Sequence, residues 1–188
     1  MSFMAIEQLM AVVSELFIFP VILAILGMFI YALFALGKFI SQSIMRRNAG
    51  MAYYQQIKAG QLKINAGYQL HNYYVQNQTA TDDELEVFAL KHLETLRIVT
   101  RLSPMLGLIA TMIPMGPALK SLADGNIQGI SENLIIAFAA VIWGLMVSIL
   151  TFWPASVKKR WFADEMINVR KIRDINETDK DESLKDAA

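Results

Sequence analysis

The stretch LFIFPVILAILGMFIYALFALG, residues 16–37, decides the fold class of this chain. It contains no charged side chain, and it is bounded by Glu15 and Lys38. Two similar uncharged stretches follow at residues 102–119 and 133–157. A helix needs roughly 20 apolar residues to cross the hydrocarbon core of a bilayer, and all three stretches are close to that length. Because no water is available there to bond the backbone, they predict three transmembrane helices.

The composition limits what else the chain can contain. At 188 residues and 55% hydrophobic content, it has room for three spans and a modest polar part, but not for a separate catalytic domain. Its net charge of zero argues against a nucleic-acid binder. The absence of cysteine excludes disulfides, thiolate metal sites and a cysteine nucleophile. The two histidines, His71 and His92, have no partner at metal-ligand spacing, so we expect no metal and no other cofactor.

The placement of lysine and arginine predicts the orientation in the membrane. Basic residues follow the first span, precede the second and follow the third, whereas residues 1–15 contain none and residues 120–132 contain only Lys120. By the positive-inside rule, the N-terminus and the 120–132 turn lie outside, and segments 38–101 and 158–188 lie in the cytoplasm. We therefore expect an all-α, multi-pass protein of the cytoplasmic membrane, whose first span is retained and not cleaved as a signal peptide.

The segments outside the spans are predicted to be mainly helical. Residues 1–15 mix apolar and acidic side chains, which suits a short interfacial helix. Past Lys38, apolar residues recur at helical spacing as far as Tyr68, so the first helix is expected to continue as a cytoplasmic stalk. The run Thr81-Asp82-Asp83-Glu84 is a capping box and predicts the start of a helix. Residues 158–188 are expected to form an amphipathic helix with a charged tail.

The third span has one small, slightly polar face. Side chains of this kind recur every three or four residues, at Ala137, Ala140, Gly144, Ser148, Thr151 and Ala155. Such a face lets membrane helices approach closely. It would also suit a shared pore or a grip on a partner helix, and the pattern alone does not separate these readings.

None of the three spans contains Asp, Glu, Lys, Arg or His. Proton relays and ion sites inside membranes ordinarily use such groups. If this protein moves protons, the titrating side chain must therefore come from another chain. The second span does contain Thr111, but a lone intramembrane threonine usually bonds back to its own helix.

Residues 104–112, PMLGLIATM, resemble the proline–glycine–threonine run that opens the second membrane helix of TolQ and ExbB and the third of MotA. Residues 137–145, which end in Gly144-Leu145, resemble the small-residue helix that follows it in the same family. The span lengths, the predicted outside N-terminus, the short outer turn and the helical stalk also fit the TolQ/ExbB arrangement.

The resemblance implies a ring-forming subunit of an ion-driven, and by expectation proton-driven, motor or energy-transducing complex. In that family a homopentamer surrounds two copies of a single-span partner of the MotB/TolR/ExbD type, whose aspartate titrates as ions cross. Thr111 matches the ring threonine of the second helix, and a hydroxyl can bond a titrating carboxylate without adding a charge. Val141 stands where the next helix has a threonine, and Ser148 and Thr151 are the candidate substitutes nearer the cytoplasm.

The expected site residues form two groups. Those expected to line the ion path are Thr111, Val141, Ser148 and Thr151. Those expected to pack the ring helices are Pro104, Gly107, Ala110 (in place of the motif glycine), Ala137, Ala140 and Gly144. The other contacts expected are with lipid, and none is expected with nucleic acid.

The sequence leaves two alternatives to the ring subunit. One is a non-conducting membrane scaffold of the same fold, in which Val141 marks a lost ion path. The other is a membrane enzyme, which is disfavoured because no nucleophile–base pair, metal cluster or phosphate loop is visible.

Overall fold

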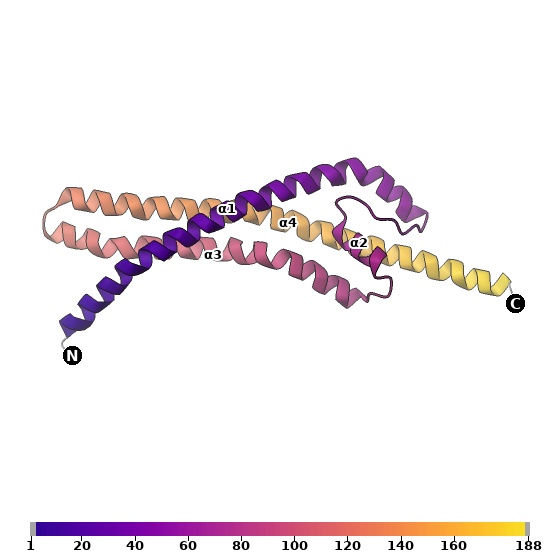
Figure 1. The fold of residues 1–188 in the computed structure, drawn as a ribbon, viewed down its shortest axis with the longest axis horizontal. Coiled ribbons are helices and arrows are strands. Elements are labelled where there is room, and N and C mark those ends of the chain that lie inside the picture. The colour runs from indigo at the N-terminus through magenta and orange to yellow at the C-terminus, as the bar shows by residue number, and fades with distance from the viewer. Residues whose placement is uncertain (1–2, 187–188) are drawn as a thin grey trace. The chain divides into compact units, whose positions relative to one another are not determined.

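The computed structural model describes the backbone of residues 3–186 and the side chains of residues 16–178. Within this part of the chain all regular structure is helical, which confirms the predicted all-α fold class. Figure 1 shows the four helices, which are α1 (Phe3–Lys58), α2 (Gln69–Gln76), α3 (Asp82–Ala123) and α4 (Ile127–Asp186).

Helices α1, α3 and α4 are each long and apolar enough to cross a membrane. They contain the three uncharged stretches and extend beyond them. The backbone of the expected interfacial segment 1–15 is part of α1 from Phe3 onward, and its side chains lie outside the described residues. Three helices of spanning length are therefore present as predicted.

Helices α3 and α4 are joined by a very short connection. Only residues 124–126 separate them, and both helices extend into the segment 120–132 that was expected to form the outer turn. Gly125 has φ of 70°, a left-handed conformation that glycine adopts without steric cost. The side of the membrane on which this turn lies stays a prediction.

The expected continuation of the first helix to Tyr68 is wrong beyond Lys58. Residues 59–68 form a loop, because Gly60 and Gly67 adopt φ of 61° and 88° and so turn the chain. A Cβ added at Gly67 would lie 2.8 Å from Cγ of Arg46, so the loop approaches α1 too closely for any other residue there. The apolar spacing in this segment thus did not mark a helix, and its residues differ in burial, since Tyr68 is buried whereas Ile64 is exposed.

The capping box at the start of α3 is confirmed. The backbone N–H of Glu84 donates to Oγ1 of Thr81 at 3.3 Å, and the N–H of Thr81 donates to Oε2 of Glu84 at 3.0 Å. These reciprocal bonds satisfy two groups at the helix start.

The chain divides into two compact units. The first, called here the apolar unit, contains the described residues up to Leu36 together with Leu96–Trp153. The second, called the polar unit, contains Gly37–Thr95 and the described residues from Pro154 onward. The polar unit corresponds closely to the segments predicted to be cytoplasmic.

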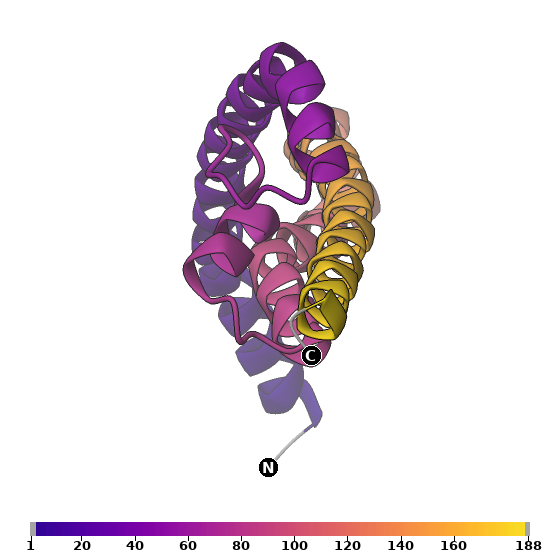
Figure 2. The same cartoon turned by 90° about the vertical axis from the view of Figure 1, so that its right-hand side faces the viewer.

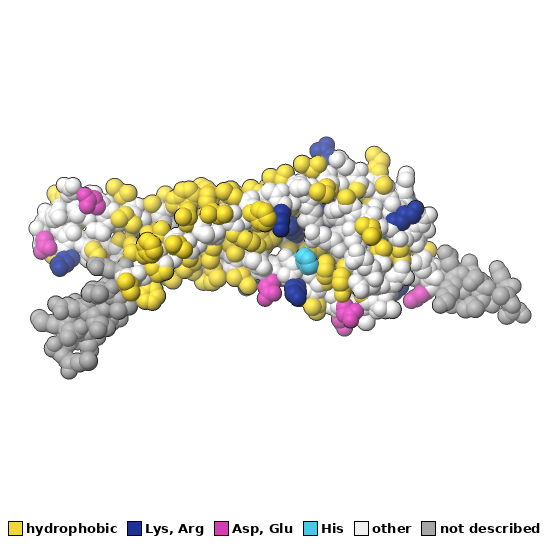
Figure 3. Space-filling model, viewed as in Figure 1, with side chains coloured by type: hydrophobic (Ala, Val, Ile, Leu, Met, Phe, Trp, Pro, Cys, Tyr) yellow, Lys and Arg dark blue, Asp and Glu magenta, His cyan; other side chains and the backbone are white. Residues whose placement is uncertain are grey.

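The apolar unit has a thin interior and a large exposed apolar surface. Its buried residues are mostly small, among them Ala32, Ala110, Ala137 and Val147. Large side chains such as Leu23, Phe138 and Ile149 point outward, and Figure 3 shows hydrophobic side chains gathered over these helices. In water such a surface would be unfavourable, whereas lipid solvates it without penalty.

The polar unit has a conventional hydrophobic core. Its α2 lies among the α1, α3 and α4 segments of the same unit (Figure 2). Leu70 of α2 packs in one cluster with Leu85 of α3 and Phe162 of α4, and Tyr53 of α1 packs in another with Ile172 of α4. This unit is therefore held by side chains from all four helices.

Candidate functional site

Helices α3 and α4 come into backbone contact through two glycines of the apolar unit. A Cβ added at Gly144 would lie 2.7 Å from the carbonyl oxygen of Ser103 and 3.2 Å from Cα of Gly107. Real Cβ atoms do not approach backbone atoms so closely, so no larger residue fits at Gly144 without a shift. The small face of the third predicted span therefore packs against α3 of the same chain.

The remaining residues expected to pack ring helices are also in the interior of one chain. Ala110 and Ala140 are buried in a cluster with Val21 and Ile25 of α1, and Ala137 is buried as well. Pro104 is half-buried within α3. Their part in a ring stays a prediction, but the structure shows that they already have partners within the subunit.

A cluster of hydroxyls joins α3 and α4 nearer the N-terminal end of α3. Oγ1 of Thr151 lies 2.8 Å from Oγ1 of Thr100 and bonds the carbonyl oxygen of Val147 at 2.9 Å. Oγ of Ser148 donates to the carbonyl oxygen of Thr100 at 2.9 Å. Thr151 is fully buried, so its hydroxyl bonds protein and not solvent.

Sequence reasoning found two members of this cluster, Ser148 and Thr151, and missed Thr100. It also missed Ser103, which is separate from the hydrogen-bonded cluster. Ser103 is fully buried, and its Oγ has no hydrogen-bond partner among the described residues. Thr100 precedes the uncharged stretch that begins at residue 102, so the sequence pattern places it in the cytoplasmic stalk. The helical spacing of Thr100, Ser103 and Gly107 on one face of α3 was the signal that could have located them.

The other two expected ion-path residues lie apart from this cluster. Thr111 is half-buried, and its Oγ1 donates to the carbonyl oxygen of Leu108 in its own helix at 2.6 Å. Val141 is half-buried, and its Cα lies 3.4 Å from the position of a Cβ on Gly107. A single chain thus brings Ser148 and Thr151 together but does not gather all four residues into one site.

An apolar crevice of about 360 Å³ lies between α1 and α4 of the apolar unit. It is lined by residues of the segments Ile22–Phe29 and Ile135–Trp143, none of them ionisable. The rings of Phe29 and Trp143 pack edge to face there, with centroids 4.7 Å apart. With such a lining the crevice suits hydrocarbon and not an ion.

The charged centre of the molecule lies in the polar unit, where Arg46 pairs with Glu165. The Arg46 guanidinium also lies 4.2 Å from the ring centroid of Tyr68 and 4.6 Å from that of Trp161. Glu165 is fully buried and accepts backbone N–H bonds from Leu70 at 2.8 Å and from the following residue at 3.0 Å. This ion pair ties α1, α2 and α4 together.

Burial raises the pKa of the Glu165 carboxyl above its ordinary value, although Arg46 and two backbone N–H groups act in the opposite direction. His71, beside it, is also buried, and its Nε2 lies 3.1 Å from the carbonyl oxygen of Lys63. Because a carbonyl only accepts, Nε2 carries the proton, and the buried Nδ1 has no partner among the described residues. Because the ring is buried, and burial disfavours the charged imidazolium, the pKa of His71 is lowered.

The bonds of this cluster link α1, α2 and α4, which is a structural role. Among the described residues, no group of three His, Asp or Glu side chains could hold a metal ion. Sequence reasoning missed the ion pair, because its members are 119 residues apart and lie in unrelated motifs.

A model of the MotA/TolQ/ExbB proton channel family matches residues 56–171, which is more than half of the chain. The matched segment includes the loop after α1, all of α2 and α3, and α4 as far as Lys171. No curated protein and no solved structure matches the chain in the corresponding searches.

Proposed function

This chain belongs to the MotA/TolQ/ExbB proton channel family, and we propose that it is the ring-forming subunit of a proton-driven, energy-transducing complex in the cytoplasmic membrane. The family match over α2, α3 and most of α4 is the observation that carries the proposal. The three helices of spanning length support it. So does the exposed apolar surface of the apolar unit, which offers room for contacts with neighbouring subunits as well as with lipid.

In the proposed complex, a homopentamer surrounds two copies of a single-span partner of the MotB/TolR/ExbD type. The partner supplies the titrating aspartate, because the three uncharged stretches of this chain contain no Asp, Glu, Lys, Arg or His. A membrane orientation with the N-terminus outside and the polar unit in the cytoplasm follows from the positive-inside rule.

The hydrogen bond of Thr111 suggests how it acts on the partner's carboxyl group. Its single hydroxyl proton is directed to the carbonyl oxygen of Leu108, which leaves the lone pairs of Oγ1 as acceptors. A protonated aspartic acid has an O–H donor, so it can bond Oγ1, whereas the aspartate anion cannot. Thr111 would thus favour the protonated state of the carboxyl group as it passes.

The substitutions Thr111→Val and Thr111→Ser test this role. Valine keeps the shape and removes the acceptor, so we expect normal assembly and loss of most proton flux, since a hydrogen bond of this kind contributes about 1 kcal/mol or more in a dry site. Serine keeps the acceptor and should retain much of the flux. Flux is measured in vesicles that contain the chain and its partner, under an imposed pH gradient.

The ring itself is tested separately. Native mass spectrometry of the purified complex should show five copies of this chain with two of the partner. A stable monomer or dimer would overturn the assembly. The ring alone should leak few protons, and robust flux without the partner would overturn the claim that the carboxyl group comes from another chain.

A non-conducting scaffold of the same fold is the second candidate. Val141 favours it, because it replaces a hydroxyl of the expected path. The bonds of Ser148 and Thr151 to α3 and α4 favour it too, because these hydroxyls are engaged inside the subunit. If vesicles with the partner conduct no protons and Thr111→Val changes no activity, this candidate replaces the first.

A further inference from the structure

The α1 segment of the polar unit carries an exposed row of side chains with the spacing of a coiled-coil seam. The row, called here the α1 seam, consists of Ile40, Ile44, Arg47, Met51, Tyr54 and Lys58. Its members alternate four and three residues apart, the heptad pattern that keeps one stripe facing a partner helix. All six are exposed, and Met51 is 85% exposed, although the polar unit is predicted to lie in water.

The α3 segment of the same unit carries a second exposed row with the same spacing. This α3 seam consists of Asp83, Val87, Leu90 and Glu94, at intervals of four, three and four residues. Val87 and Leu90 are large apolar side chains left exposed. In a single subunit neither seam is covered, which is unfavourable for apolar side chains in water.

The two seams are complementary in charge and in position along their helices. We measure the distance along each helix from the end of its predicted span, Gly37 in α1 and Leu102 in α3, with a rise of about 1.5 Å per residue. On this scale Arg47 lies roughly 15 Å from Gly37, and Glu94 lies roughly 12 Å from Leu102. Met51 and Leu90 lie roughly 21 Å and 18 Å out. The offset is nearly constant, so an antiparallel pair would match these residues level by level.

The outer ends match in the same way. Lys58 lies roughly 32 Å along α1 from Gly37, and Asp83 lies roughly 29 Å along α3 from Leu102. In the part of the chain that the structure describes, neither of these residues forms an ion pair, and nor do Arg47 and Glu94. Two basic residues of one seam thus face two acidic residues of the other, with apolar residues between them.

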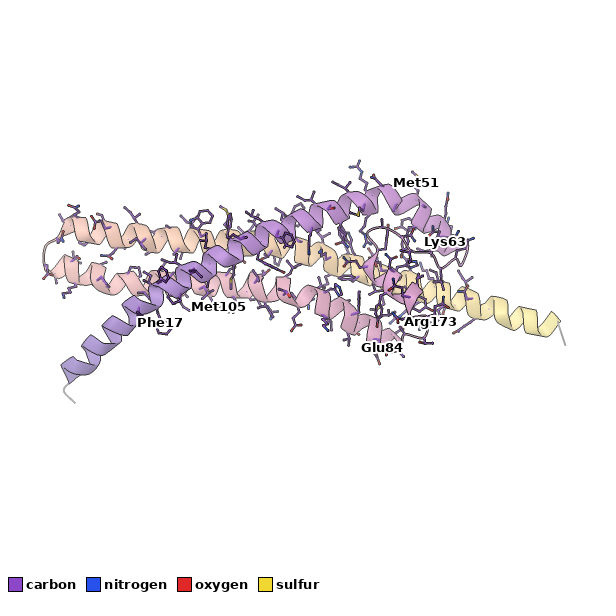
Figure 4. The ribbon with its side chains drawn as sticks, in the orientation of Figure 1. Phe17, Met51, Lys63, Glu84, Met105 and Arg173 are labelled. Atoms are coloured by element: carbon purple, nitrogen blue, oxygen red, sulfur yellow. The ribbon has the colours of Figure 1, made fainter. Side chains whose placement is uncertain are left out.

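The residues of both seams of the polar unit are exposed in the single chain, so the two seams do not pair with each other within it. In Figure 4, Met51 points outward from the upper edge of this unit, and Glu84, next to the start of the α3 seam, lies at its lower edge. A contact between two different patches of identical chains is a head-to-tail contact, which forms a ring when the rotation from one copy to the next closes.

We propose that the α1 seam of one subunit packs antiparallel against the α3 seam of the next copy of this chain. This inference rests on the proposed ring and identifies one of its contacts. It places Arg47 beside Glu94 of the next copy, Met51 beside Leu90, and Lys58 beside Asp83.

Disulfide cross-linking tests the contact, since the natural chain has no cysteine. Met51→Cys and Leu90→Cys in one chain should give a ladder of cross-linked species up to the full ring upon mild oxidation in membranes. A mixture of the two single variants should give dimers, and each single variant alone should give none. Ala52→Cys with Leu90→Cys is the matched control, because Ala52 is exposed but lies about 100° around the helix from Met51.

A charge-reversal arm makes the test specific to the seam. In the cross-linking background, Arg47→Glu should lower the yield several-fold, and adding Glu94→Arg should restore it. An unchanged yield in both variants would contradict the predicted register.

The outcomes separate this inference from the proposed function. Native mass spectrometry is run first on the same samples. A ring without Met51–Leu90 cross-links overturns the seam contact and leaves the ring standing, and cross-links in the single Met51→Cys variant indicate a symmetric contact and also overturn it. If no oligomer forms, the ring proposal fails and this inference fails with it.

Discussion

Alanine at Gly144 should destabilise the chain, although alanine is ordinarily the better helix former. The added Cβ would lie 2.7 Å from the carbonyl oxygen of Ser103 and 3.2 Å from Cα of Gly107, both backbone atoms that cannot rotate away. Overpacking of this kind costs about 1–3 kcal/mol. The gain from replacing a helical glycine by alanine is about 0.5–1 kcal/mol. Subtracting it from the overpacking cost leaves a net loss of up to about 2.5 kcal/mol, with a midpoint of roughly 1 kcal/mol.

Two other glycines provide matched controls for this prediction. A Cβ at Gly27 would have no atom within 4 Å, so Gly27→Ala should be neutral or slightly stabilising. A Cβ at Gly107 would lie 3.4 Å from Cα of Val141, an ordinary contact. The stability of the Gly107→Ala variant should therefore lie between those of the Gly27→Ala and Gly144→Ala variants. The assay is reversible unfolding in mixed micelles with increasing denaturing detergent. Equal stability of the Gly144→Ala and Gly27→Ala variants would refute the close approach of α3 and α4.

Three further changes should have distinct effects. Thr151→Val should lower the free energy of unfolding by about 1 kcal/mol, because it removes a buried hydroxyl bonded to Thr100. Thr151→Ser, which keeps the hydroxyl, is the control. Equal losses of stability in the two variants would assign the effect to packing and not to the hydrogen bond. Glu165→Gln should lower the free energy of unfolding by about 3 kcal/mol, because it leaves the Arg46 charge without its buried partner. Limited proteolysis of this variant should then cut the loop of residues 59–68. Protection of the loop equal to that in the wild type would contradict this prediction. His71 has a lowered pKa in the folded state, so its contribution to stability is complete above the unfolded pKa of about 6.5 and is lost as the pH falls toward the folded pKa. Thermal unfolding at pH 7.5 and pH 5.5 should show this loss in the wild type and a smaller one in His71→Asn.

The parts of the fold that could be predicted are those set by local pattern. Three uncharged stretches predicted the helices of spanning length, and the capping box at Thr81 predicted the start of α3 within one residue. The helical spacing between Lys38 and Tyr68 was correct only as far as Lys58, because it did not register the turns at Gly60 and Gly67.

At the candidate site too, patterns within one helix could be predicted from the sequence, whereas contacts between helices could not. The pattern of α4 identified a small face that includes Gly144 and Thr151, but it did not say what the face packs against. The answer depends on α3, through Ser103 and Gly107, and periodicity within one helix contains no information about another. The Arg46–Glu165 pair was missed for the same reason.

Because Arg46 and Glu165 are far apart in the sequence, the polar unit cannot be completed until late in synthesis. At about 5–20 residues per second, the 119 residues between them take the ribosome roughly 6–24 s to add. During that interval the first span and α2 have been made, but the buried carboxylate that anchors Arg46 and the N–H groups of Leu70 and His71 does not yet exist. A nascent chain that ends between residues 158 and 164 therefore contains all three uncharged stretches but lacks the carboxylate that joins α1, α2 and α4.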